Sequence, residues 1–343
     1  MTTPISTGST APMSRRKPIM TPTITKTDTT AGRFRSMFHA ALGPVILNAL
    51  ADPRVLEVMV NADGRVWLDR AGAGRACGGS VGASRGESVI RLVADHVGEE
   101  VGRHRPVVSG TLPETGERFQ GQLSPVTVAP TFSIRKRAEL VFTIDDYVRE
   151  SIMTAVQARQ LHEAVVARHN VLIAGGTGSG KTTLANALLA EPAFAEDRVI
   201  LIEDTRELQC SSPDRIELLT KKTEPAVTMD DLVRHALRLR PDRIVVGEVR
   251  GGEALSLLKA WNTGHPGGLA TIHANGPEDA LARLEDLIGE VSQRVPRRAI
   301  ARAVNCIVFI RRTPEGRRVE SVGQVIRHDG NEYQIDVFDN DKT

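Results

Sequence analysis

The chain has 343 residues, more than one typical domain and about right for two. Apolar residues make up 41% of it, charged residues make up 25%, and the formal net charge is only +2. These values are typical of a globular protein with an apolar core, and the balanced charge argues against a dedicated nucleic-acid coat or a basic membrane binder. Cys77, Cys210 and Cys306 lie far apart and form no CxxC pair, which disfavours both a zinc module and a disulfide framework.

The N-terminal region carries no targeting pattern. No apolar run approaches the ~18 residues of a membrane span, and the start of the chain lacks the apolar centre of a signal peptide. We therefore expect a soluble, cytosolic protein in a reducing environment. Residues 1–32 are rich in Thr, Ser and Pro without apolar periodicity, which predicts a disordered tail. A transit peptide, or a true start at Met13 or Met20, are the alternatives for this segment.

Residues 33–143 mix helical and strand patterns, which predicts a smaller α+β domain. The segments 55–61 and 65–70 are typical of two strands joined by a turn. Apolar residues at helical spacing over 33–53 predict a helix that precedes them and buries Phe34, Met37, Phe38, Leu42, Ile46 and Leu50.

The remainder of this half has weaker signals. The Gly-rich stretch 71–86 is predicted to be a loop. A second helix is expected from Ser88, whose side chain would cap it, and the segment 105–137 is expected to be rich in strands. Residues 144–153 are predicted to link the two domains.

Residues 154–338 predict a second domain of alternating strands and helices. Its first helix, over 154–169, is expected to turn Leu161, Val165 and Val166 inward. Near-continuous apolar runs then predict a parallel sheet covered on both faces. These runs are VLIAG, VILIE, RIVVGE and GLATIHA. Towards the end of the chain, Asp329-Gly330 predicts a β-hairpin.

One motif defines the chemistry. Residues 175–182 fit the pattern G-x-x-x-x-G-K-[ST], between an expected strand and an expected helix. Backbone N–H groups of such a loop wrap phosphates, Lys181 can reach the β- and γ-phosphates, and the hydroxyl of Thr182 can hold Mg²⁺. The sequence thus predicts an ATP and Mg²⁺ site formed by Gly175, Gly176, Thr177, Gly178, Ser179, Gly180, Lys181, Thr182 and Thr183.

Acidic residues and a histidine follow other strands of the expected sheet. Glu203 and Asp204 end one strand, and Glu248 ends another. Ligands of parallel sheets lie beyond the carboxyl ends of the strands, so these acids can bind Mg²⁺ or orient water beside the phosphate loop. His273 follows a further strand and can sense the γ-phosphate.

Four segments together resemble a known family. GGTGSGKTTL, IEDTREL, RLRPDRIVVGEVRGGEAL and NTGHPGGLATIHANGPEDAL occur in this order. They look like the Walker A, Asp, Walker B and His boxes of the type II/IV secretion ATPase superfamily, and in particular of its conjugal-transfer ATPases. The resemblance covers about residues 33–338. It implies a RecA-like P-loop ATPase domain, with a mainly parallel sheet, behind a smaller α+β domain.

The resemblance also implies roles for residues. Glu203 would be the catalytic base of the Asp box, Glu248 the Walker B acid acting through Mg²⁺ and its water, and His273 the His-box residue. Arg118 and Arg135 match arginines of the N-terminal domain that approach the phosphates in relatives. Arg240 and Arg250, on either side of the Walker B strand, are further candidates.

The implied assembly is a homo-hexameric ring with nucleotide between the two domains. Its place would be the cytoplasmic face of the inner membrane, peripherally attached, with inner-membrane components of a conjugative secretion channel as partners. The work would be pilus assembly, substrate transfer or both. Gly247 stands where many other P-loop ATPases carry Asp, which leaves the magnesium contact of this box open.

Two other function classes use the same phosphate loop. A nucleic-acid translocase is suggested by the Arg-rich segments RHALRLRPDR and QRVPRRAIAR, but aromatic residues for base stacking make up only 3% of the chain. A solvated helix face explains the arginines of these two segments at least equally well. A small-molecule kinase is the third class, and release of free phosphate from ATP alone would argue against it.

Overall fold

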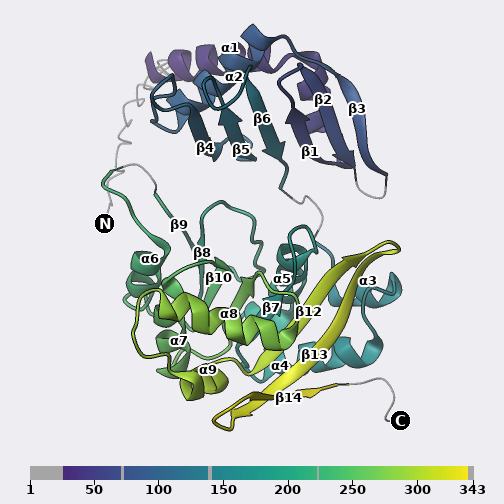
Figure 1. Cartoon of the computed structure of the whole chain (residues 1–343), viewed down its shortest axis with the longest axis vertical. Coiled ribbons are helices and arrows are strands. Elements are labelled where there is room, and N and C mark those ends of the chain that lie inside the picture. The colour runs from purple at the N-terminus through teal and green to yellow at the C-terminus, as the bar shows by residue number, and fades with distance from the viewer. Residues whose placement is uncertain (1–25, 71–72, 138–140, 222–223, 339–343) are drawn as a thin grey trace, which may run out of the picture.

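The computed structural model describes residues 26–70, 73–137, 141–221 and 224–338, with side chains from residue 32 onward. Two sheets, each with its own helices, lie one above the other (Figure 1). Helix α1 (Lys26–Ala51) begins seven residues before the expected start of order at Arg33. Residues 1–25 of the predicted tail lie outside the described residues. Every helix of the described ranges is too short or too polar to span a bilayer.

The N-terminal sheet has six antiparallel strands in the order β3-β2-β1-β6-β5-β4. Helices α1 and α2 (Ala83–His96) cover one face and bury Phe38, Leu42 and Ile46 against it, as the periodicity predicts. The strands are β1 (Val55–Val60), β2 (Arg65–Arg70), β3 (Gly74–Ser80), β4 (Val107–Thr111), β5 (Arg118–Gln122) and β6 (Thr131–Arg135).

Three details of this half differ from the sequence prediction. The loop expected over 71–86 is wrong, because β3 pairs with β2 and α2 already begins at Ala83. A Cβ on Gly78 would lie 2.5 Å from Cδ1 of Leu68. This glycine therefore leaves room for the side chain of Leu68 within the sheet, and it does not indicate a loop. Ser88 is not a cap: it lies inside α2, and its hydroxyl donates to the carbonyl of Ser84. Met37, expected inside, is exposed.

The C-terminal sheet has eight strands in the order β14-β13-β12-β7-β11-β10-β8-β9. The six strands from β12 to β9 are parallel, and β13 and β14 add an antiparallel edge that contains the predicted hairpin. The strands are β7 (Val171–Ala174), β8 (Val199–Glu203), β9 (Arg215–Leu219), β10 (Arg243–Val249), β11 (Leu269–Ile272), β12 (Cys306–Thr313), β13 (Gly316–His328) and β14 (Tyr333–Val337).

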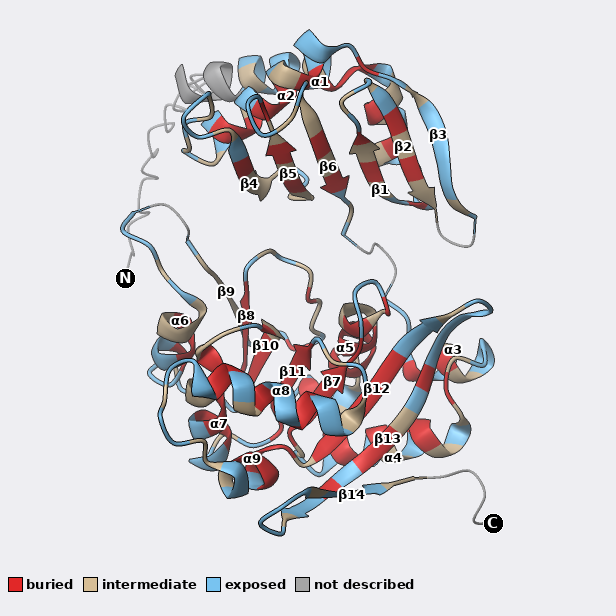
Figure 2. Cartoon of the chain, viewed as in Figure 1, coloured by how far each residue is buried: buried red, intermediate tan, exposed pale blue. Residues whose placement is uncertain are grey.

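Helices cover both faces of this sheet, so its central strands are buried throughout (Figure 2). One face carries α3 (Ile144–Arg149), α4 (Ala155–Val166) and α5 (Lys181–Leu189). The other carries α6 (Met229–Ala236), α7 (Glu253–Asn262), α8 (Pro277–Gly289) and α9 (Arg297–Ala303). The predicted strands are all present, whereas the half-exposed edge strand β9 has no clear sequence signal.

The predicted linker of 144–153 overlaps helix α3 of the C-terminal sheet. Ile144 and Tyr147 of α3 pack into the core of the C-terminal sheet, and Thr143 caps this helix. We therefore propose that the division between the domains lies within 136–143. In α4, Leu161 and Val165 point inward as expected, but Val166 is exposed.

A buried ion pair holds the start of the Walker B strand. Nε of Arg243 donates to Oδ2 of Asp197 at 2.5 Å, and these side chains are only 2% and 3% exposed. The guanidinium also donates to three backbone carbonyls, and it lies over the ring of Phe194 at 4.4 Å. Oδ1 of Asp197 also pairs with the partly exposed Arg168. The charge of Arg243, by contrast, has Asp197 as its one acidic partner among the described residues, so removal of Asp197 would leave it uncompensated.

We predict that Asp197→Ala lowers the free energy of unfolding by about 3–5 kcal/mol, since it leaves the Arg243 charge buried. The matched control is Asp214→Ala, because Asp214 pairs with Arg198 at the surface and is 59% exposed. That exposed pair should contribute less than about 1 kcal/mol. Denaturant unfolding of the full chain measures both values, and equal losses would contradict the assignment.

Candidate active site

The phosphate loop connects β7 to α5 at the centre of the parallel sheet, and its glycines are required by geometry. A Cβ on Gly175 would lie 2.2 Å from the carbonyl oxygen of Ile310 on the neighbouring strand β12. Gly178 and Gly180 have φ angles of 71° and 104°, in the left-handed region that favours glycine. Residues 177–183, apart from the buried Ser179, line a common cleft.

Lys181 is buried at the first position of α5. Its side chain is placed by hydrogen bonds from Nζ to the carbonyl oxygens of Gly175 and Gly176, each 3.0 Å long. Nζ also lies 3.3 Å from Nδ1 of His273. Burial lowers the pKa of Lys181, an effect that the carboxylate of Glu248 opposes.

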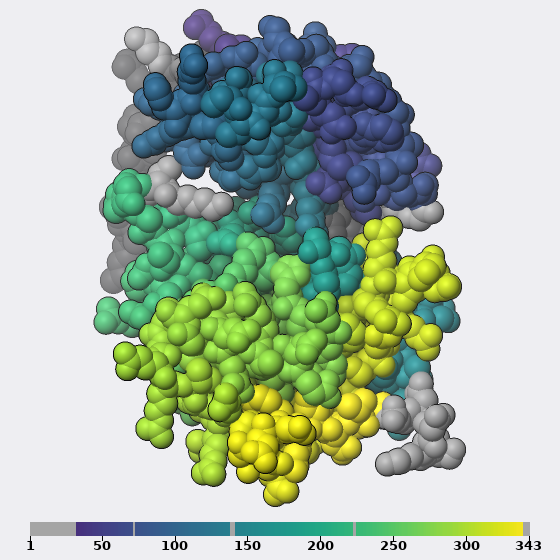
Figure 3. Space-filling view, in the orientation of Figure 1, coloured from purple at the N-terminus to yellow at the C-terminus, as the bar shows by residue number. Residues whose placement is uncertain are grey.

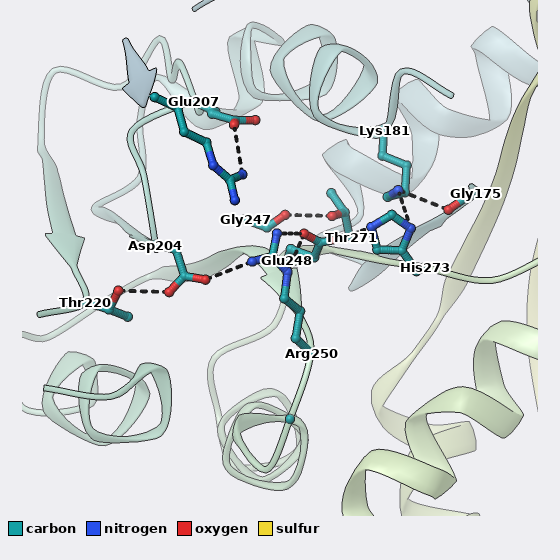
Figure 4. A network of polar contacts seen from close by, with 12 residues as sticks. Gly175, Lys181, Asp204, Glu207, Thr220, Gly247, Glu248, Arg250, Thr271 and His273 are labelled. Atoms are coloured by element: carbon teal, nitrogen blue, oxygen red, sulfur yellow. Dashed lines mark hydrogen bonds and ion pairs between the residues drawn. The ribbon is translucent and has the colours of Figure 1, made fainter. Parts of the chain in front are cut away.

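A chain of polar contacts runs from Lys181 across the strand ends (Figure 4). An ammonium group only donates, so Nδ1 of His273 accepts and its proton resides on Nε2. Nε2 lies 2.5 Å from Oε1 of Glu248, without the alignment of a hydrogen bond. Oε2 of Glu248 accepts from Arg250, which in turn pairs with Asp204 at 3.0 Å. Burial lowers the pKa of His273, and the Lys181 charge lowers it further.

Glu203 ends β8 and is only 4% exposed. Its Oε1 accepts hydrogen bonds from the backbone N–H groups of Glu207 and Leu208, at 2.9 and 2.8 Å. Burial nevertheless raises the pKa of Glu203 to about 7. The carboxyl therefore takes up and releases a proton near neutral pH, a property that suits a general base.

The cleft lies between the two sheets and has a volume of about 470 Å³. Figure 3 shows a hollow between the upper and lower parts of the molecule. Arg118 and Arg135 face each other on β5 and β6 and line this cleft opposite the phosphate loop. Nη1 of Arg118 is 3.9 Å from Oε1 of Glu207. Two arginines far from the loop in sequence thus face it across the domain boundary.

The structure brings together nearly all the predicted site residues. Glu203, Glu248 and His273 line the same cleft as the phosphate loop and the two arginines. Ser179 is buried with its hydroxyl unpaired. Arg240 is the exception, because it precedes the start of β10 at Arg243, whereas Glu248 lies near the end of that strand. It therefore lies away from the cleft.

Other lining residues were missed by the sequence analysis. Glu57 lies opposite Arg135 in the ladder between β1 and β6. Thr271 donates to the carbonyl of Gly247 at 2.7 Å and fixes the end of the Walker B strand. Arg317 comes from the C-terminal edge of the sheet. No local motif marks these residues, since strand pairing alone brings them to the cleft.

The oxygen donors in the cleft fit a magnesium ion that is held partly by its substrate. Oε1 of Glu248 is buried without a hydrogen bond, and the hydroxyl of Thr182 lines the cleft. Mg²⁺ commonly takes one or two protein oxygens together with phosphate oxygens and water. Accordingly, the described residues contain no cluster of three or more His, Cys, Asp and Glu side chains that could hold a metal alone.

Comparison with known proteins identifies the family. Residues 111–332 match the family model described as type II/IV secretion system protein. The chain belongs to this family. It is 48% identical over 298 residues to a probable conjugal transfer protein TrbB of Sinorhizobium fredii, covering 86% of this chain and 91% of that protein. It is 46% identical over 300 residues to the conjugal transfer protein TrbB of Rhizobium radiobacter, covering 87% and 92%.

The fold of this family member also matches solved structures. The pilus retraction motor PilT with bound ADP gives a TM-score of 0.59 at 18% identity and covers 83% of each chain. The predicted fold class is therefore confirmed: an antiparallel N-terminal sheet precedes a mainly parallel α/β sheet. The resemblance to secretion ATPases is confirmed by the family match, and that family implies nucleotide binding.

The buried carboxyl of Glu203 predicts a pH-dependent stability. Because its pKa rises from 4.5 to about 7 on folding, the folded chain holds a proton there that the unfolded chain releases between these values. The stabilising contribution of this group is present at low pH and is lost as the pH rises through about 7. We expect the free energy of unfolding of the wild type, relative to Glu203→Gln, to fall by about 3 kcal/mol across this window.

Denaturant titrations of both proteins, in steps from acidic to neutral pH, measure this difference. Gln keeps an oxygen that can accept the two backbone hydrogen bonds, so it removes the titration and retains the contacts. A difference that stays constant with pH would contradict the raised pKa.

Proposed function

We propose that the chain is an ATPase that powers a conjugative type IV secretion system, in pilus assembly, substrate transfer or both. The observation that carries this proposal is the meeting of Lys181, Glu203 and Glu248 in one cleft, at the carboxyl ends of three parallel strands. The TrbB relatives are named as conjugal transfer proteins, and the PilT structure holds ADP, which supports both the process and the nucleotide.

The phosphate loop would bind the nucleotide through the backbone N–H groups at the start of α5 and through the ammonium of Lys181. In the present geometry Nζ of Lys181 is engaged by two carbonyl oxygens of its own loop. Phosphate oxygens would take the place of these carbonyls as acceptors. Mg²⁺, held by Thr182 and Glu248, would neutralise charge on the phosphates.

Glu203 is proposed as the base that orients the attacking water and accepts its proton. Its pKa of about 7 keeps a substantial deprotonated fraction at neutral pH, and burial keeps the carboxylate poorly solvated. Its hydrogen bonds from Glu207 and Leu208 fix the orientation of the group. Glu248 is proposed to act through Mg²⁺, and His273, between Lys181 and Glu248, to respond to the γ-phosphate.

Arg118 and Arg135 are proposed to close the cleft on the phosphates. A guanidinium can grip phosphate oxygens with two parallel hydrogen bonds. Both arginines belong to the N-terminal sheet, so their attraction to the nucleotide would draw that sheet towards the phosphate loop. Hydrolysis would weaken this attraction, and the connection within 136–143 would serve as the hinge.

A homo-hexameric ring, peripheral on the inner face of the inner membrane, is the proposed working form. In such a ring the opening and closing of each cleft would move neighbouring subunits. Inner-membrane components of the conjugative channel are the proposed partners. This proposal rests on the relationship to conjugal transfer proteins, and native mass spectrometry with and without ATP and Mg²⁺ would test the ring.

We predict that Lys181→Ala abolishes both ATP binding and hydrolysis, while the fold is retained. Glu203→Gln should still bind ATP but hydrolyse it ~10²–10⁴-fold more slowly, because it lacks the base. Glu248→Gln should instead require more Mg²⁺ for half-maximal rate. Phosphate release at a series of Mg²⁺ concentrations distinguishes the three. Normal hydrolysis by Lys181→Ala would refute the site. If Glu248→Gln lost hydrolysis and Glu203→Gln required more Mg²⁺ instead, the roles assigned to Glu203 and Glu248 would have to be exchanged.

We predict that Arg135→Ala weakens ATP binding more than ADP binding and removes ATP-induced compaction of the chain. Arg135→Lys should recover only part of both, because Lys cannot form the bidentate contact. Small-angle scattering and ATP titration measure the two effects. Arg75→Ala is the control, since Arg75 is an exposed arginine of the same sheet outside the cleft. Unchanged affinity and compaction in both Arg118→Ala and Arg135→Ala would reject the clamp.

A further inference from the structure

The hairpin of β12 and β13 brings a fourth arginine to the cleft from the opposite side. Strand β12 pairs in parallel with β7, and its Ile310 lies directly against Gly175 of the phosphate loop. The hairpin continues past this point towards the N-terminal sheet (Figure 1). Arg317, the second residue of β13, therefore lies beside the loop although it is far from it in sequence.

The side chain of Arg317 runs over the loop itself. Its Cδ and Nε lie 2.9 and 3.2 Å from the position that a Cβ on Gly180 would occupy. Gly180 is the last loop residue before Lys181, so the guanidinium stem crosses the start of α5, where phosphate would bind. A larger residue at position 180 would displace the side chain of Arg317.

Arg317, like Arg135, has no ion pair with an acidic side chain among the described residues, unlike the other two arginines of the cleft. Arg250 pairs with Glu248 and Asp204, and Arg118 lies near Glu207. Within the part of the chain that the structure describes, the side chain of Arg317 makes no hydrogen bond or ion pair, although its charge acts on the buried Tyr147 of α3. Its guanidinium is thus available for an anionic ligand.

The sheet order indicates which part of the ligand Arg317 faces. Strands β11, β10 and β8 lie on one side of β7 and carry His273, Glu248 and Glu203. Arg317 comes from β12 and β13 on the other side. The groups proposed for hydrolysis therefore define the γ-phosphate end of the cleft, and Arg317 lies on the flank away from it.

We propose that Arg317 is a nucleotide-binding residue that contacts the part common to ATP and ADP, at the α- and β-phosphates. This inference rests on the proposed ATP site and adds a specific contact to it. Arg317 would hold the nucleotide before and after hydrolysis, whereas Arg118 and Arg135 would respond to the γ-phosphate. The hairpin edge of the sheet thereby becomes part of the binding site.

The test is the affinity of the full chain for MgATP and for MgADP, each measured by calorimetric titration. Arg317→Ala should weaken both by the same factor, about 10–100-fold, as expected for loss of a charged hydrogen bond to phosphate. Arg317→Lys should recover part of the affinity for both nucleotides. Arg318→Ala is the matched control: the neighbouring side chain points to the opposite face of β13 and carries the same charge.

Each outcome decides the proposal. Unchanged affinities in Arg317→Ala, an effect on ATP alone, or an equal loss in Arg318→Ala would overturn it. Arg317 is exposed, and melting temperatures of the variants will verify that they fold. Lys181→Ala separates the two levels of inference: if it binds both nucleotides normally, the proposed ATP site itself is wrong, whereas loss of binding there with an unaffected Arg317→Ala rejects only the role of Arg317.

Discussion

A buried ammonium group without a contacting carboxylate is the constraint on which the site depends. Nζ of Lys181 contacts two carbonyl oxygens of its own loop and the ring of His273. Glu248 contacts the other side of that ring. Burial disfavours this charge, so the site contains a cation that gains from an incoming anion. The strand ends of β10 and β11 and the turn into α5 are arranged around this one group.

The parallel sheet supplies the precision that such an arrangement requires. The registers of β7 with β11 and with β12 place the phosphate loop between His273 on one side and the hairpin on the other. The buried pair of Arg243 and Asp197 anchors β10 at its opposite end. The N-terminal sheet adds two arginines, so the cleft is built from both sheets.

Much of this organisation could be predicted from local sequence. Continuous apolar runs identified the buried parallel strands, and the spacing of Gly and Lys identified the phosphate loop. The prediction failed where a residue's role is set by contacts distant in sequence. Gly78 belongs to a strand because Leu68 packs against it, and Arg317 reaches the loop because β12 pairs with β7. The placement of Arg118 and Arg135 in the cleft was anticipated only through family resemblance, because nothing in their local sequence distinguishes them from surface arginines.

Gly247 shows how the two acidic boxes depend on each other. A Cβ at this position would lie 3.0 Å from Cγ of Glu203, closer than side chains normally pack, and 3.5 Å from its Oε1. The space beside the end of β10 is therefore already filled by the glutamate of β8. An aspartate at 247 would therefore require the side chain of Glu203 to shift by a few tenths of an ångström. The glycine of the Walker B box thus leaves room for the buried glutamate of the Asp box, so a substitution in one box would act on the other through this contact.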